Sequence, residues 1–178
     1  MNESTLATQC SKGDNQARRM LYECYARHMF ALCYRYAGDE QTAEDLLHDG
    51  FIRVFETIQN FEYRGEGSLK AWIGRLFANV ALGHLRKQAN WETCSLEELE
   101  EEITEAEIDI VPSEVLMQFI AELPVGYRAV FNQYVMEGQS HKEVADAMGI
   151  AESASRSQLT RAKTMLAKKI KDWNENNS

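Results

Sequence analysis

The sequence predicts an all-α protein of two small helical domains joined by an acidic linker. Apolar residues recur at helical spacing along most of the chain, and no run alternates as a β-strand does. Prolines number only two in 178 residues. The whole formal net charge of -9 falls within residues 91–112, which contain nine acids and no base. These observations predict an N-terminal helical bundle over 1–90, a linker over 91–112 and a C-terminal four-helix domain over 113–178.

The N-terminal domain is predicted to contain four helices. Turn residues separate them, since Gly13 and Gly38 follow apolar helical stretches and Asp39 is a good N-cap. The second helix carries Leu21 and Leu32 on its apolar face. A loop rich in turn residues, 63–68, precedes the fourth helix. The expected ranges are 5–12, 14–37, 39–60 and 69–88.

The C-terminal domain is predicted to end in a helix-turn-helix. Ser140 and Glu143 form a capping box that starts a helix, and Gly149 can adopt the left-handed conformation that ends it. The next helix runs from about Glu152 into the 160s. Small Ala145 lies where the two helices would cross, as this motif requires. Two further helices are expected before the pair, over 113–122 and 124–136.

The second helix of this pair is strongly basic. Residues 153–171 contain six positive side chains and no negative one. An ordinary helical hairpin with a solvated basic face is one interpretation. The other is a DNA-reading helix, in which Arg suits guanine edges and hydroxyls suit phosphate oxygens. The helix-turn-helix pattern favours the second interpretation.

Several function classes lack their sequence signals. There is no phosphate-cradling glycine loop and no nucleophile elbow, so no enzymatic chemistry is expected. No apolar run reaches the ~20 residues of a membrane span, and the first residues do not resemble a signal peptide. We therefore expect a cytoplasmic chain without membrane insertion.

The cysteines do not predict a metal site or a disulfide framework. None of the four belongs to a CxxC pair, so they are expected to be free thiols, with Cys24 and Cys33 in a core. Cys24 and His28 lie at i, i+4 and could share a metal, but no second ligand pair follows. No metal and no cofactor are predicted. The remaining cysteines are Cys10 and Cys94.

Four segments together resemble a known family. Residues 43–55 (AEDLLHDGFIRVF) are similar to the sigma-factor region that docks on the clamp of bacterial RNA polymerase. Residues 67–75 with 79–82 resemble the segment that melts and reads the minus-ten element. Residues 123–131 with 137–140 resemble the start of the C-terminal sigma domain, and 155–163 resemble its recognition helix. Their order and spacing resemble the extracytoplasmic-function (ECF) sigma factors of the sigma-70 family.

The resemblance implies a dissociable promoter-specificity subunit. Such a protein binds core RNA polymerase at its clamp and flap, places its helix-turn-helix on the minus-thirty-five element, and melts the minus-ten element with its N-terminal domain. Its partners would be double- and single-stranded promoter DNA and an anti-sigma factor. The acidic linker would follow the channel for nascent RNA, or act as a solvated spacer that discourages DNA binding away from polymerase.

The resemblance also assigns site residues. Acidic residues on one side of the 39–60 helix would pair with arginines of the clamp, although a solvated acidic face is the plain alternative. Aromatic and basic residues around the 63–68 loop would hold unstacked bases, with Trp72 a core residue or a base contact. The polymerase-binding set is Glu44, Asp45, His48 and Asp49. The minus-ten set is Phe61, Tyr63, Arg64, Trp72, Arg75, Asn79 and Arg86. The minus-thirty-five set, expected to be exposed, is Ser153, Ser155, Arg156, Ser157, Thr160 and Arg161.

Three positions depart from the family pattern. Gly83 stands where an acidic residue is usual. Ala151 replaces a capping Ser or Thr, which would weaken the start of the recognition helix by ~1 kcal/mol. Lys163 replaces a frequent Arg, so a forked clamp becomes a point charge. Two other functions remain open: an autonomous helix-turn-helix regulator that binds operators as a dimer, and a thiol or zinc sensor built on Cys24, His28 and Cys33.

Overall fold

The computed structural model describes residues 2–88 and 111–177, and within these ranges it contains helices and no strand. The predicted all-α fold is confirmed. The chain separates into two compact units, residues 1–83 and 84–178. Most of the expected acidic linker lies outside the described residues. None of the described helices combines the length and apolar character that crossing a membrane would require.

Local capping signals set the helix boundaries of the first unit. Asp14 and Asp39 accept backbone hydrogen bonds from residues three positions on, at 2.7 and 2.8 Å. Gly38 ends the second helix with φ +87°. The boundaries predicted at these residues are confirmed. The elements are α1 (Glu3–Ser11), α2 (Asn15–Ala37), α3 (Glu40–Thr57), η1 (Ile58–Asn60) and α4 (Ser68–Gln88), whose last residues, from 84 on, belong to the second unit.

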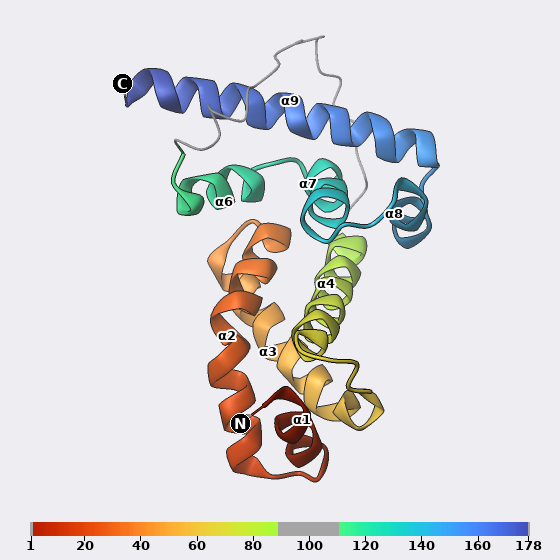
Figure 1. Cartoon of the computed structure of the whole chain (residues 1–178). Coiled ribbons are helices and arrows are strands. Elements are labelled where there is room, and N and C mark those ends of the chain that lie inside the picture. Colours follow the sequence, from red (N-terminus) through yellow and green to blue (C-terminus); the bar gives the residue numbers. More distant parts are fainter. Residues whose placement is uncertain (1, 89–110, 178) are drawn as a thin grey trace. The chain divides into compact units, whose positions relative to one another are not determined.

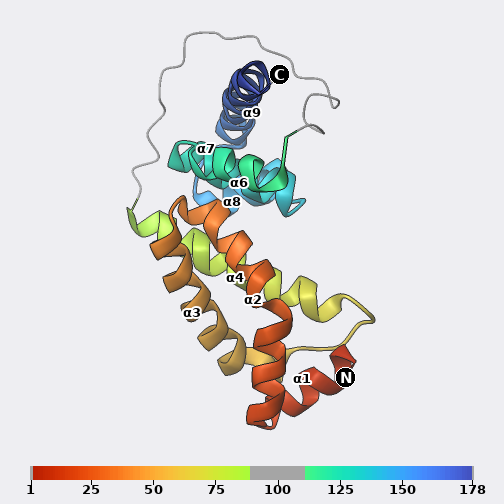
Figure 2. The same cartoon turned by 90° about the vertical axis from the view of Figure 1, so that its left-hand side faces the viewer.

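The first unit is built around the pair α2 and α3, which lie side by side in both views (Figures 1 and 2). Phe51 of α3 is at the centre of an aromatic cluster. Its ring centroid lies 4.6 Å from that of Tyr22 in α2 and 5.2 Å from that of Phe77 in α4. Gly50 leaves room for the fully buried Phe77 ring. This cluster joins α4 to the other two helices.

The prediction for the cysteines was partly wrong. Cys33 is buried as expected, and burial raises the pKa of its thiol to about 12, which keeps it protonated. Cys24, however, is exposed, and Cys10 is buried instead. Cys24 is not among the buried residues of α2, which include Leu21 and Leu32.

The second unit is organised by α9, which runs across α6, α7 and α8 (Figure 1). The helix predicted over 124–136 is not uniform, because α7 passes into a π-helical turn. There the buried side-chain amide of Asn132 donates to the carbonyl of Arg128 at 2.9 Å. The Glu137 N–H donates to the Asn132 carbonyl five residues earlier. The elements are α6 (Ser113–Ala121), α7 (Val125–Phe131), η2 (Asn132–Met136), α8 (His141–Met148) and α9 (Glu152–Asn176).

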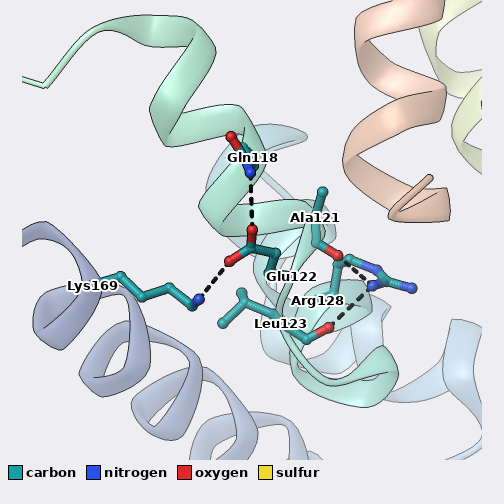
Figure 3. Close-up of polar contacts among 6 residues, drawn as sticks. All are labelled: Gln118, Ala121, Glu122, Leu123, Arg128 and Lys169. Carbon is teal, nitrogen blue, oxygen red and sulfur yellow. Dashed lines mark hydrogen bonds and ion pairs between the residues drawn. The ribbon is translucent and has the colours of Figure 1, made fainter. Parts of the chain in front are cut away.

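Side chains fix the turn between α6 and α7 (Figure 3). The buried guanidinium of Arg128 donates to the carbonyl of Ala121 (2.6 Å), the last residue of α6, and to that of Leu123 (3.1 Å), two residues beyond it. Lys169 of α9 forms an ion pair with Glu122 at 2.6 Å and lowers the pKa of that carboxyl. The turn is therefore held both from within and by the long helix.

Candidate nucleic-acid interface

The helix-turn-helix predicted from the sequence is present. Ser140 accepts from the Glu143 N–H at 3.2 Å, and the Glu143 carboxylate accepts from the Ser140 N–H at 2.7 Å. Gly149 has φ +68° and ends α8. Ala145 is 5% exposed. The capping box, the left-handed glycine and the small buried residue of α8 are all confirmed.

One face of α9 presents polar side chains to solvent. Its members are spaced i, i+3, i+4 and i+7, so they lie along one side of the first two turns. The Arg156 guanidinium makes an i, i+4 ion pair with Glu152 on the same helix. An exposed pair of this kind is worth about 0–1 kcal/mol, so a nucleic acid could displace it. The exposed residues of this reading face are Ser153, Arg156, Ser157 and Thr160.

The expectation that Ser155 is exposed was wrong. Its side chain is fully buried, and its hydroxyl forms a 2.9 Å hydrogen bond with Nδ1 of His141 in α8. The His141 ring stacks on Tyr134, with 4.2 Å between centroids. Ser155 lies i-4 from Leu159 and i-7 from Ala162, which places it on the inward face of α9. The helical phase of Ser155 in the sequence indicates this inward position, whereas its polarity alone favours exposure.

We expect Ser155→Ala to destabilise the second unit by about 1 kcal/mol, because it removes the partner of a partly buried imidazole. Chemical denaturation would measure this as a lower midpoint. Ser157→Ala is the matched control, since Ser157 is exposed and should change the midpoint little. Equal midpoints for the two variants would contradict a structural role for the contact between Ser155 and His141.

The remaining part of α9 differs in two ways from the expectation. The helix continues to Asn176, well beyond the 160s. Arg161 is half-buried, with its guanidinium 3.5 Å from the Tyr127 hydroxyl, so part of this side chain belongs to the packing of α7 on α9. Ala151 provides no side-chain cap, as its residue type predicts.

A second polar face lies on α4 and the loop before it. Trp72, Arg75 and Asn79 are spaced i, i+3 and i+7 on one side of α4, and Arg86 continues the same side in the last turn. Arg75, Asn79 and Arg86 are exposed. Trp72 is half-buried and packs against Phe61, with 5.5 Å between ring centroids, so it is neither a fully buried core residue nor a free one. The loop residues Tyr63 and Arg64 are exposed.

A third face lies on α3. The four residues of the predicted polymerase-binding set are all exposed and lie at i, i+1, i+4 and i+5, on one side of the helix. Two of them, Glu44 and His48, line an open depression of about 340 Å³ between α2 and α3. Tyr22 in this depression is 44% exposed. The lining residues are Tyr22, Phe30, Glu44, Leu47, His48 and Phe51.

Comparisons with known proteins assign the chain to a protein family. Residues 21–90 match the family model of sigma-70 region 2, and residues 113–166 match that of sigma-70 region 4. Among similar proteins, the ECF RNA polymerase sigma factor SigW of Bacillus subtilis is 25% identical, covering 92% of this chain and 94% of that protein. SigE of Mycolicibacterium smegmatis is 27% identical over 80% of this chain and 57% of that protein.

A solved structure, that of CnrH in complex with the cytosolic domain of CnrY, is 18% identical and covers 94% of this chain and 96% of that one, with a TM-score of 0.49.

The two regions that match the sigma-70 family models cover α2 to α4 and α6 to most of α9, which is where all three polar faces lie. An autonomous regulator would not require a region 2. The chain therefore belongs to the sigma-70 family, among its extracytoplasmic-function members, and is a sigma factor, a subunit that binds core RNA polymerase and directs promoter recognition and transcription initiation.

Proposed function

We propose that each of the three polar faces of the chain binds a different partner. The face of α3 binds core polymerase, the face of α4 with its loop holds the melted minus-ten strand, and the reading face of α9 contacts the minus-thirty-five duplex. In this proposal residues 1–90 and 113–178 are the two working domains. The observation that carries it is the exposed row of polar residues on the first two turns of α9, on the second helix of a helix-turn-helix.

Arg156 is the proposed base-reading residue of α9. Its fork of donors suits O6 and N7 of guanine in the major groove. Ser153, Ser157 and Thr160 flank it on the same exposed face and suit phosphate oxygens. Arg161 is proposed to reach phosphate from its half-buried position. Ser155 is not part of this contact set, because it is buried against α8.

The proposal predicts different losses at two basic residues of α9. Arg156→Ala should cost about 1–3 kcal/mol of discrimination at one promoter position and relax specificity there. Lys168→Ala, about three turns nearer the end of the helix, should weaken binding uniformly and reduce its salt dependence. Holoenzyme affinity for a set of single-base promoter variants at two salt concentrations would measure both. The same uniform weakening from both variants would refute the assignment of Arg156.

The face of α4 is proposed to trap single-stranded DNA. Aromatic and guanidinium planes hold unstacked bases at about 1–3 kcal/mol each. The exposed Tyr63 and Arg64, with the partly exposed Phe61 and Trp72, supply such planes, while Asn79 offers both a donor and an acceptor to a base edge. Arg75 and Arg86 extend the positive surface. Gly83, on the same side of the helix, contributes no side chain to contact DNA.

The face of α3 is proposed to bind the polymerase clamp. Exposed carboxylates beside a partly apolar depression suit a protein surface that carries arginines and apolar side chains. In this proposal Asp45 and Asp49 accept charge-assisted hydrogen bonds, with Glu44 and His48 at their edge. The large exposed side chain of Tyr22 beside these carboxylates favours a protein-binding surface over a purely solvated acidic face.

The proposal has consequences for partners and location. Polymerase supplies the catalytic chemistry, and this chain contributes binding alone. The polymerase acts in the cytoplasm, so the chain is proposed to work there as well. An anti-sigma factor that withholds the chain from polymerase is part of the proposal through the family resemblance. The proposed path of the acidic linker concerns residues outside those that the structure describes.

A further inference from the structure

The carboxylate of Glu3 joins three segments of the first unit that are distant in sequence. Its Oε2 accepts hydrogen bonds from the backbone N–H groups of Gly67 (2.9 Å) and Leu69 (3.3 Å). Its Oε1 accepts one from the Tyr25 hydroxyl (3.1 Å). Glu3 is the first residue of α1. One side chain therefore connects α1 both to α2 and to the start of α4.

The start of α4 requires an acceptor from elsewhere. The first N–H groups of a helix have no intrahelical partner, and the N-cap side chain usually satisfies one of them. At α4 that position is occupied by Gly67, whose carbonyl accepts from the Ala71 N–H at 3.0 Å. Its φ of +84° favours glycine, which has no side chain to serve as a cap. Glu3 supplies the acceptor, and its negative charge is favourable at this end of the helix.

The same contact fixes the end of the loop that precedes α4. Within the loop, the Ser68 hydroxyl donates to the Gly65 carbonyl at 2.6 Å and accepts from the Arg64 N–H at 3.2 Å. The bond from the Gly67 N–H to Glu3 ties this folded loop to α1. Tyr63 and Arg64, proposed above to hold the melted strand, stand at its beginning. Their placement therefore depends on the hydrogen bonds of Ser68 within the loop and on the bond from the loop to Glu3 of α1.

The position of Glu3 is fixed by the packing of α1 and by its hydrogen bond with Tyr25. Leu6, Ala7 and Cys10 bury one face of α1, which packs on α2 and η1. Burial, and after it the Glu3 charge, raise the pKa of Tyr25 to about 12, so the phenol stays protonated and remains a donor. Residues 1–20 lie before the part of the chain that matches the region 2 model, so that match assigns α1 no role.

We propose that Glu3 is a positioning residue for minus-ten recognition, which it supports by capping α4 and holding the loop that carries Tyr63 and Arg64. This inference rests on the proposed function of that loop. It extends the minus-ten apparatus to α1, a helix that would itself touch no DNA.

The test uses holoenzyme reconstituted with Glu3→Gln or Glu3→Ala. The probe is labelled single-stranded DNA from the minus-ten region of a promoter that the wild-type holoenzyme transcribes. Since losing a cap changes an equilibrium by roughly five- to tenfold, we expect oligonucleotide binding to weaken by about that factor. Assembly with core polymerase and binding of a minus-thirty-five duplex should be unchanged. Glu23→Gln, the same chemical change at an exposed site on α2, should match wild type.

Two controls separate positioning from general loss of stability. Val54→Ala truncates a fully buried residue of α3 and should lower the melting temperature without a selective loss of oligonucleotide binding. Amide hydrogen exchange in Glu3→Gln should become faster at Gly67 and Leu69, whether or not the chain acts at promoters. Unchanged exchange at these amides, or a binding loss that follows melting temperature equally in Glu3→Gln and Val54→Ala, would overturn the proposal. A wild-type holoenzyme that recognises no promoter would instead refute the proposed function.

Discussion

Gly50→Ala should destabilise the first unit by about 2 kcal/mol. A Cβ at this position would lie 2.5 Å from Cζ and 2.6 Å from Cδ1 of the Phe77 ring, and closer still to Cε1. Phe77 is fully buried against Phe51 and has no room to withdraw. Overpacking of this kind costs about 1–3 kcal/mol or more, which exceeds the gain of about 1 kcal/mol in helix propensity. Calorimetry should show the first unit melting roughly 10 °C lower.

Gly74→Ala provides the matched control. Gly74 lies within α4, and a Cβ added there would meet no atom within 4 Å. Helix propensity then acts alone, so this variant should be more stable than wild type by about 0.5–1 kcal/mol. Opposite signs for the same substitution would show that the close approach of α3 to the Phe77 ring makes Gly50 necessary. A stabilised Gly50→Ala would contradict the packing described here.

Asp45→Arg should abolish assembly with core polymerase and leave the fold intact. The residue is exposed in the middle of the acidic face of α3, so reversing its charge disturbs no buried contact. Against a clamp that carries arginines, the change removes an attraction and adds a repulsion. Together these are worth on the order of 3 kcal/mol, or about a hundredfold in affinity. Pull-down of core polymerase with the variant measures this directly.

Glu56→Arg serves as the control for charge reversal. Glu56 is exposed on the same helix three turns further along, and its partner Arg53 is also exposed. This variant should retain polymerase binding within a few-fold. If Asp45→Arg captures core polymerase as well as Glu56→Arg does, the acidic face is a solvated surface and the docking proposal fails.

Helix boundaries could be predicted from the sequence because the residues that set them act over a few positions of the chain. Asp14, Asp39 and Ser140 act as caps through side chains that reach only three residues along the chain, and Gly38 and Gly149 adopt left-handed turns where helices end. Each of these interactions is contained in a short window. The helix boundaries and the helix-turn-helix could therefore be predicted without knowledge of the tertiary structure.

Tertiary contacts account for most of what the sequence did not reveal. The cap of α4 comes from Glu3, 64 residues before Gly67, and no short window contains both. In the π-helical turn, the amide of Asn132 is buried and bonds the Arg128 carbonyl, and no local signal in the sequence shows that burial. Ser155 is an exception, because its helical phase relative to Leu159 indicated an inward position. The residues of the candidate faces on α3 and α4 were implied by the family resemblance, whereas the depression beside Tyr22 required the packing of α2 on α3.

Run-off transcription with purified core polymerase tests the central claim most directly. A library of promoter fragments would be transcribed with and without the chain, and with Asp45→Arg in its place. The account predicts initiation at a defined class of promoters only when the wild-type chain is present. Tight binding of DNA by the chain alone, with no polymerase-dependent initiation at any fragment, would contradict it.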